Sequence, residues 1–67
     1  MLAIEIEREE DGRWLAEIPA IPGALVYGAT LAEARVKIEA LALRVIADRI
    51  EHGESVPVET SSLFAAA

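Results

Sequence analysis

The sequence lacks cysteine entirely and contains only three aromatic residues, one each of Trp, Tyr and Phe. The absence of cysteine excludes disulfide bonds and thiolate metal sites. Hydrophobic residues make up 54% of the chain, but thirteen of them are alanine, so large apolar side chains are scarce. A domain this small buries only about 60% of its unfolded surface, and small domains without covalent staples often complete their core by association. We therefore expect a homo-oligomer, either a dimer or a tetramer.

Basic residues are also scarce. Six Lys and Arg oppose twelve Asp and Glu, which gives a net charge of −6, and the basic residues are scattered along the chain. Attraction to phosphate supplies most of the non-specific affinity for nucleic acid, so we expect no direct binding of DNA or RNA by this chain alone. Opposite potentials raise association rates, which makes a basic protein the natural partner.

Long apolar runs are absent as well. No stretch approaches the roughly 20 apolar residues that a membrane-spanning helix needs. The N-terminal segment becomes charged at Glu5, before the apolar core of a secretory signal could form. We expect a cytoplasmic, soluble protein with no membrane partner.

The N-terminal part of the chain predicts a β-hairpin. Residues 2–9 alternate between apolar and polar side chains, which is the period-two pattern of a strand with one buried face. Asp11-Gly12 predicts a two-residue turn in which both positions have positive φ. The second strand of the hairpin is predicted at residues 13–18.

A third short strand is predicted to complete an antiparallel meander. In the second strand Leu15 falls among the outward residues, and the buried side is predicted to carry Trp14, Ala16 and Ile18. Pro22-Gly23 suits the centre of a type II turn, because Pro presets φ and Gly accepts the positive value. The third strand then follows at residues 24–28.

Residues 31–52 predict one long helix packed across this sheet. Thr30 and Glu33 form a capping box, in which the two side chains satisfy exposed backbone amides at the helix start. Gly53 suits the position after the helix end, and His52 lies near the negative end of the helix dipole.

The predicted helix is apolar on two sides. The stripe expected to cover the sheet consists of Leu31, Ala34, Ile38, Leu41, Ala42 and Val45. A second apolar set points about 140° away at 100° per residue. Its members, which we predict to form an oligomer interface, are Val36, Leu43, Ile46 and Ile50.

The remaining residues, 53–67, form a weakly patterned tail. Both a short edge strand and a helical turn are compatible with its sequence, and the two alternatives stay open. The predicted fold class is α+β, with β-β-β-α order and all 67 residues in a single domain.

Two segments, taken in order, resemble the HicB-like antitoxin family. Residues 12–23 (GRWLAEIPAIPG) and 28–34 (GATLAEA) are similar to the family pattern D-G-x-aromatic-x-A-x-x-P-x-x-P-G, a short strand, and G-D-T-x-x-E-A at the start of a helix. The likeness spans about residues 4–52. Three positions depart from the family pattern. Ala20 stands where an acidic residue is common, Ala24 where Cys is common and Ala29 where the pattern has Asp.

The resemblance implies a partial RNase H-like fold and a role in a type II toxin–antitoxin system. Members of the family neutralise a small basic RNA-cleaving toxin of the HicA kind by covering its active site. Many members also carry a DNA-binding domain. The 67 residues leave no room for one beside the predicted fold, so we do not expect autorepression by this chain alone.

Charge and alternation indicate the outer sheet face and the acidic hairpin as the recognition surface. The candidate partner-binding residues are Glu5, Glu7, Glu9, Glu10, Asp11, Leu15 and Glu17. The alternative hypothesis is an orphan oligomeric scaffold or small-ligand-binding protein of the same fold, without a toxin partner. The adjacent reading frame discriminates between the two, because a short basic product favours the antitoxin.

No residue pattern predicts catalysis, a cofactor or a metal site. RNase H-type chemistry needs several carboxylates converging on two metal ions. Glu5 and Glu7 share a strand face, but acids 9–11 lie in a turn, where such side chains are usually solvated. His52 is the only histidine and has no neighbour to orient it as a general base. We expect a non-catalytic protein without a cofactor.

Overall fold

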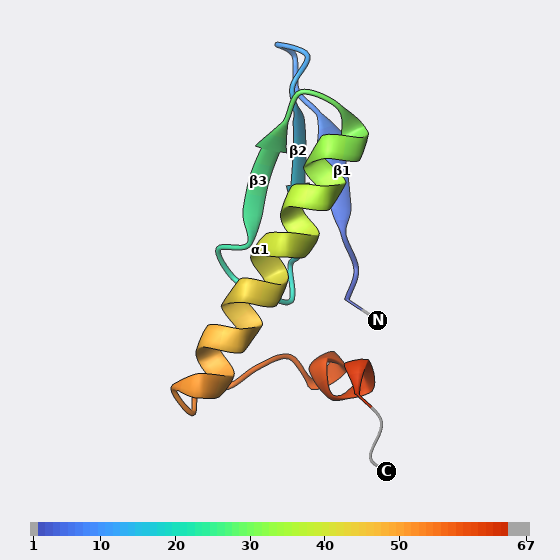
Figure 1. The fold of residues 1–67 in the computed structure, drawn as a ribbon. Helices are drawn as coiled ribbons and strands as arrows, with labels where there is room; N and C mark the ends of the chain where they lie inside the picture. Colours follow the sequence, from blue (N-terminus) through green and yellow to red (C-terminus); the bar gives the residue numbers. More distant parts are fainter. Residues whose placement is uncertain (1, 65–67) are drawn as a thin grey trace.

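The computed structural model describes residues 2–64, which form three strands, one long helix and a short 3-10 helix (Figure 1). The elements are β1 (Glu5–Arg8), β2 (Trp14–Glu17), β3 (Leu25–Gly28), α1 (Leu31–Glu51) and η1 (Val58–Leu63). The strands pair antiparallel in the order β1-β2-β3, and α1 crosses one face of the sheet. The predicted α+β class and β-β-β-α order are confirmed. None of the helices within residues 2–64 is long and apolar enough to span a bilayer.

Each strand is shorter than its predicted range. The β1–β2 ladder runs only from the Glu5–Glu17 pair to the Arg8–Trp14 pair. Beyond Glu17 the chain turns, and the Ile18 N–H donates to the Ala24 carbonyl at 3.1 Å. The segment before β1 therefore has no strand to pair with, although its apolar side chains still pack against the core. The predicted alternation of buried and exposed side chains is therefore correct, whereas the predicted strands are too long.

The hairpin turn differs from the predicted one. The Gly12 N–H donates to the Glu9 carbonyl at 3.0 Å, and the Glu9 N–H donates to the Arg13 carbonyl at 2.8 Å. Gly12 has φ +90°, whereas no non-glycine residue of the described chain has positive φ. The loop is thus a turn followed by a glycine bulge, not a two-residue turn with both positions at positive φ. The second predicted turn is confirmed, with Gly23 at φ +87°.

The caps of α1 follow the sequence prediction closely. The Glu33 N–H donates to Thr30 Oγ1 at 3.0 Å, and the Glu33 carboxylate accepts from the Ala29 N–H at 3.4 Å. At the other end Gly53 has φ +71°, and the Glu54 N–H donates back to the Arg49 carbonyl at 2.8 Å. Both ends therefore have backbone groups satisfied locally.

Gly28 ends β3 at the point where the sheet lies closest to α1. A Cβ atom at this position would lie 2.5 Å from the Ala34 backbone nitrogen and 2.8 Å from its Cα. Glycine is required here because the two backbones approach closely. Its conformational freedom is not the reason, since φ at Gly28 is not in the left-handed region. This contact holds the start of α1 against the third strand.

The core is small and rich in alanine. Its buried members are Ala16, Ile18, Ile21, Ala24, Ala34, Ile38, Ala42 and Ile46. Small side chains on both the sheet and the helix allow the two to pack closely, as interaxial distances depend on the side chains at the contact.

Two side chains of the helix differ in burial from the prediction. Ile46, predicted in the oligomer interface, is only 4% exposed and belongs to the core. Leu31, predicted to cover the sheet, is 46% exposed, because it precedes the turn of the helix that first meets β3.

The tail contains the 3-10 helix η1, so the helical alternative is the one observed among the described residues. Val56 packs against the core, and Thr60 is buried. The Thr60 hydroxyl has no hydrogen-bond partner within residues 2–64. Residues 65–67 of the predicted tail lie outside the described residues.

Candidate partner-binding surface

The sheet face opposite α1 gathers most of the predicted binding residues. The register aligns Glu5, Glu17 and Leu25 in one row and Glu7, Leu15 and Tyr27 in the next. We call these six residues the outer sheet face. Three carboxylates therefore surround the half-buried side chain of Leu15. The sequence-based assignment of these acids and Leu15 to one face agrees with this register.

The acids of the outer sheet face have no cationic partner among the residues that the structure describes. Glu5 lies directly across the ladder from Glu17, and neither residue forms an ion pair there. Like charges directly opposite each other on a sheet are destabilising. Glu7, Leu15 and both of these acids also line a small hollow of about 160 Å³. The arrangement concentrates negative potential at one place on the sheet.

The tip of the hairpin is organised around Arg13. Its Nε lies 2.7 Å from the Asp11 carboxylate, and its guanidinium lies 4.3 Å from the centre of the Tyr27 ring. Hydrogen bonds from the Arg13 backbone N–H and then from its side chain lower the pKa of Asp11. Arg13 is thus engaged with Asp11 and Tyr27, and it does not neutralise the three glutamates of the sheet.

The remaining predicted acids lie on the hairpin, next to the outer sheet face. Glu9 is half-buried and Glu10 is exposed. Together with Glu7, Asp11 and Tyr27 they line an open hollow of about 470 Å³, which Arg8 and Arg13 also line. The predicted residues therefore form one continuous surface from the middle of the sheet to the hairpin tip.

Leu25, Tyr27 and Arg13 were missed as members of this surface. The alternation of β3 puts Leu25 and Tyr27 on one side of the strand and Val26 on the other. Only the pairing with β2 shows that this side is the one that carries Leu15. Leu25 and Tyr27 are 44% and 40% exposed, so they add apolar area next to the acids.

A second hollow, of about 360 Å³, lies between α1, the N-terminal segment and η1. Its walls are mainly apolar and include Ile4, Leu43, Ile46 and Leu63, with Glu39 among the polar lining residues. Ile46 therefore contributes to this hollow as well as to the core. Of the other predicted interface residues, Val36, Leu43 and Ile50 are exposed.

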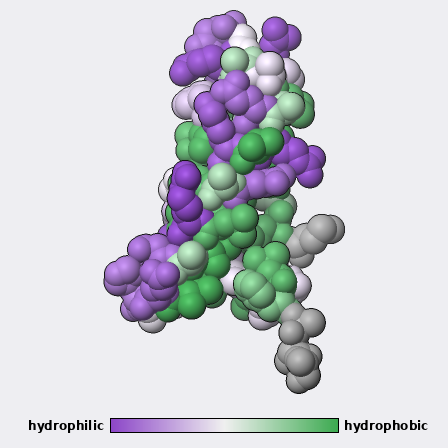
Figure 2. All heavy atoms as spheres, viewed as in Figure 1, coloured by the Kyte–Doolittle hydropathy of each residue, from purple (hydrophilic) through white to green (hydrophobic). Residues whose placement is uncertain are grey.

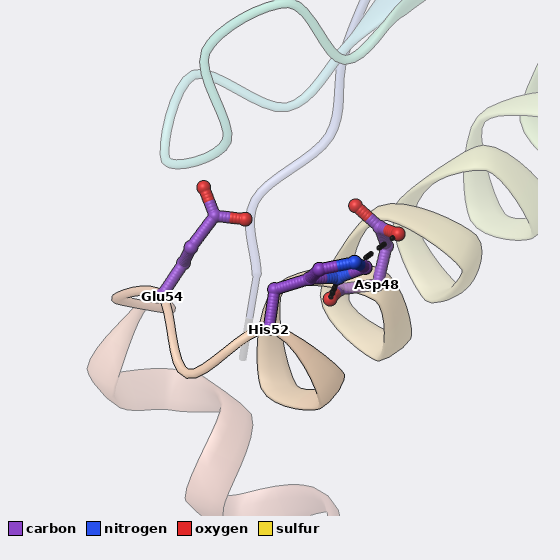
Figure 3. A group of neighbouring side chains, drawn as sticks. All are labelled: Asp48, His52 and Glu54. Atoms are coloured by element: carbon purple, nitrogen blue, oxygen red, sulfur yellow. Dashed lines mark hydrogen bonds and ion pairs between the residues drawn. The ribbon is translucent and has the colours of Figure 1, made fainter.

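Asp48, His52 and Glu54 come together at the end of α1 (Figure 3). His52 Nδ1 lies 2.7 Å from the Asp48 carbonyl oxygen and 3.4 Å from its carboxylate. All three side chains are exposed. A histidine that interacts with the carbonyl end of a helix explains this geometry without a metal ion.

Comparison with known proteins identifies two relatives of this chain. A UPF0150 protein of Thermoplasma acidophilum is 33% identical over 52 residues, which cover 78% of this chain and 75% of the relative. A UPF0150 protein of a Synechocystis strain is 41% identical over 46 residues, which cover 69% of this chain and 64% of the relative. No protein-family model matches the sequence, and no solved structure matches it significantly.

Proposed function

Because this chain belongs to the UPF0150 family, we propose that it acts as a non-catalytic protein-binding domain of the HicB-like antitoxin kind. Its partner is a small basic RNA-cleaving toxin of the HicA kind, which it neutralises by covering the active site. The proposal is supported by the fold, the acidic net charge and the sequence segments that resemble the HicB-like pattern.

The observation that carries the proposal is the outer sheet face. Glu5 and Glu17 face each other across the ladder without a cation between them among residues 2–64, an arrangement that disfavours the isolated fold. A partner that brings a Lys or Arg between them converts this repulsion into two attractions. Leu15 and Tyr27 supply the apolar contact beside the charges, and tyrosine is among the residues that dominate binding energy at interfaces.

The chemistry of an RNA-cleaving partner fits this surface. A protein that binds RNA neutralises phosphates with Lys and Arg, so its active site is positively charged. A surface that carries several carboxylates competes with RNA for the same cationic groups. Occupying the active site in this way inhibits the toxin without any reaction on the part of this chain.

The test is co-expression with the product of the adjacent reading frame, followed by size-exclusion chromatography with light scattering. The informative variant replaces the three acids of the outer sheet face with glutamine, namely Glu5→Gln, Glu7→Gln and Glu17→Gln. The matched control makes the same change in net charge at the other end of the molecule, with Asp48→Asn, Glu54→Gln and Glu59→Gln.

We expect a mixed complex with the wild-type chain and with the control variant. The outer-face variant should associate roughly tenfold more slowly or worse at low ionic strength, because electrostatic complementarity acts mainly on the association rate. Loss of like-charge repulsion should leave this variant at least as stable as the wild type, which separates lost binding from misfolding. A failure to form any complex with a basic neighbour refutes the proposal. Equal binding by both variants refutes the assigned surface.

A second candidate function, binding of a small apolar ligand by an orphan protein, is favoured by one observation. The hollow between α1 and η1 has about 360 Å³ and mainly apolar walls, a size within the range of ligand sites. An increase in melting temperature with uncharged apolar compounds, and not with the neighbouring gene product, would select this function.

A further inference from the structure

The outer side of α1 carries a second apolar stripe that remains exposed, and one of its members, Leu43, also lines the edge of the hollow beside η1. Its members are Val36, Ala40, Leu43, Ala47 and Ile50, and all five are exposed. The three large ones, Val36, Leu43 and Ile50, are 68%, 59% and 53% exposed. Figure 2 looks onto this side of α1 and shows hydrophobic side chains along the lower part of the helix, with hydrophilic side chains to their left. We call these five residues the outer helix stripe.

The spacing of the outer helix stripe is that of a helix–helix seam. Successive members are four, three, four and three residues apart, which is the repeat that keeps one line of side chains facing a partner helix. Single exposed apolar residues are common on protein surfaces, whereas a line of them over about 21 Å, at 1.5 Å per residue, is not. The core-facing side of α1 is already occupied by the sheet, so this seam needs a separate partner.

The alternation of large and small residues selects the orientation of that partner. In an antiparallel pair of identical helices, each alanine layer of one copy meets a large side chain of the other, for example Ala47 against Leu43. In a parallel, in-register pair, Ala40 and Ala47 would meet their own copies and leave gaps between the layers. Antiparallel packing therefore fills the layers of Ala40 with Ile50 and of Leu43 with Ala47, while Val36 lies at the rim, beyond the end of the partner's helix.

The charges beside the stripe agree with the antiparallel arrangement. Lys37 and Glu51 flank the stripe on the same side, and both are equally distant in sequence from Arg44. When the two-fold axis passes near Arg44 and Val45, Lys37 of one copy lies beside Glu51 of the other, twice by symmetry. Lys37 already contacts Glu33 at 2.7 Å and donates to the Tyr27 carbonyl at 3.4 Å, which leaves the third donor of its ammonium for a second carboxylate.

We propose that the outer helix stripe is the interface of a homodimer in which the α1 helices of two copies pack antiparallel. The seam consists of Val36, Ala40, Leu43, Ala47 and Ile50, so it retains three of the predicted interface residues and replaces Ile46 with two alanines. The dimer leaves the outer sheet face free on both copies, because α1 separates the two surfaces. The proposal does not rest on the proposed function and is tested on the chain alone.

The first test measures the mass of the purified chain by light scattering over a range of concentrations. The chain of 7.2 kDa should elute with twice that mass. Ala47→Glu should raise the dissociation constant roughly a hundredfold or more, because symmetry buries two unpaired carboxylates in each dimer. Ala20→Glu, an equal change of charge in an exposed turn, is the matched control and should leave the dimer intact. A monomeric wild type, or a dimer that persists in Ala47→Glu, overturns the proposal.

The second test determines the orientation with single-cysteine variants, which are clean because the chain has no cysteine of its own. Arg44→Cys places two thiols near the proposed two-fold axis and should form a disulfide-linked dimer on mild oxidation. In Ala40→Cys the two thiols would lie about 15 Å apart along the helices and should not cross-link. Cross-linking through Ala40→Cys and not through Arg44→Cys would show parallel helices and overturn the antiparallel arrangement.

Discussion

Gly28 is predicted to be the position where the smallest possible substitution has a large effect. Gly28→Ala adds one methyl group, which would lie 2.5 Å from the Ala34 backbone nitrogen and 2.8 Å from its Cα. Optimal separations between such atoms are about 3.5–4.0 Å, so β3 and the start of α1 must move apart by about 1 Å. The atoms in the way belong to the backbone, and no side-chain rotation can relieve the overlap.

The expected cost of Gly28→Ala follows from overpacking in other cores. Inserting a methyl group into a closely packed site typically costs about 1–3 kcal/mol. In a domain of this size each 1 kcal/mol lowers the melting temperature by about 4–8 °C, so we expect a fall of roughly 5–20 °C. Thermal unfolding followed by circular dichroism measures this directly, and urea titration gives the free energy of unfolding.

Two comparisons isolate the cause of the destabilisation. Gly53→Ala is the control for glycine replacement in general, because Gly53 has φ +71° and open space around its missing Cβ. It should cost about 1 kcal/mol through backbone strain alone. Adding Ala34→Gly to Gly28→Ala removes only the contact with the Ala34 Cβ, at 3.0 Å, and should not restore stability. A Gly28→Ala variant as stable as the wild type, or full rescue by Ala34→Gly, would refute the close approach of the two backbones.

Three further substitutions test individual contacts. Thr30→Ala removes the acceptor for the Glu33 N–H and should cost about 1 kcal/mol in urea denaturation, and an unchanged midpoint would mean that α1 begins elsewhere. Thr60→Val removes a buried hydroxyl that has no partner within residues 2–64 and should stabilise the fold by about 1 kcal/mol, whereas a lower melting temperature would indicate a hydrogen bond. The hydrogen bond and charge of Lys37, followed by the Ala29 N–H, lower the pKa of Glu33. Its ionised form therefore stabilises the fold above the unfolded pKa, and this contribution is lost as the pH falls through the lower folded pKa. Wild type and Glu33→Gln should differ in melting temperature at pH 7 and converge in acid, and a constant difference would contradict this assignment.

The features predicted correctly depend on residues close together in the sequence. The capping box needs only Thr30 and Glu33, and the helix end needs only Gly53 and its neighbours. The alternation of residues 2–9 and 13–18 gives the two sides of each strand for the same reason. The predicted type of hairpin turn was wrong, because Asp11-Gly12 is compatible with more than one loop. The hydrogen bonds of Glu9 show that the longer loop, with a glycine bulge, is formed.

The candidate site was predicted in part. Alternation assigns Glu5, Glu7 and Glu17 to the outward positions of their strands, which is enough to predict an acidic face. It does not predict that Glu5 stands directly opposite Glu17, because that depends on the register between strands. Nor does it add Tyr27 to the surface, since the side of β3 that shares the face follows from its pairing with β2.

The amino-acid sequence by itself determined the order of the elements, the caps of α1, the two apolar sides of that helix and the excess of negative charge. These properties are periodic or local, and each is encoded by residues within a few positions of one another. Only the tertiary structure decided that Ile46 joins the core and that Gly28 touches Ala34. The reason is that burial depends on which surfaces of the sheet and tail lie against the helix, and those contacts join residues that are distant in the chain.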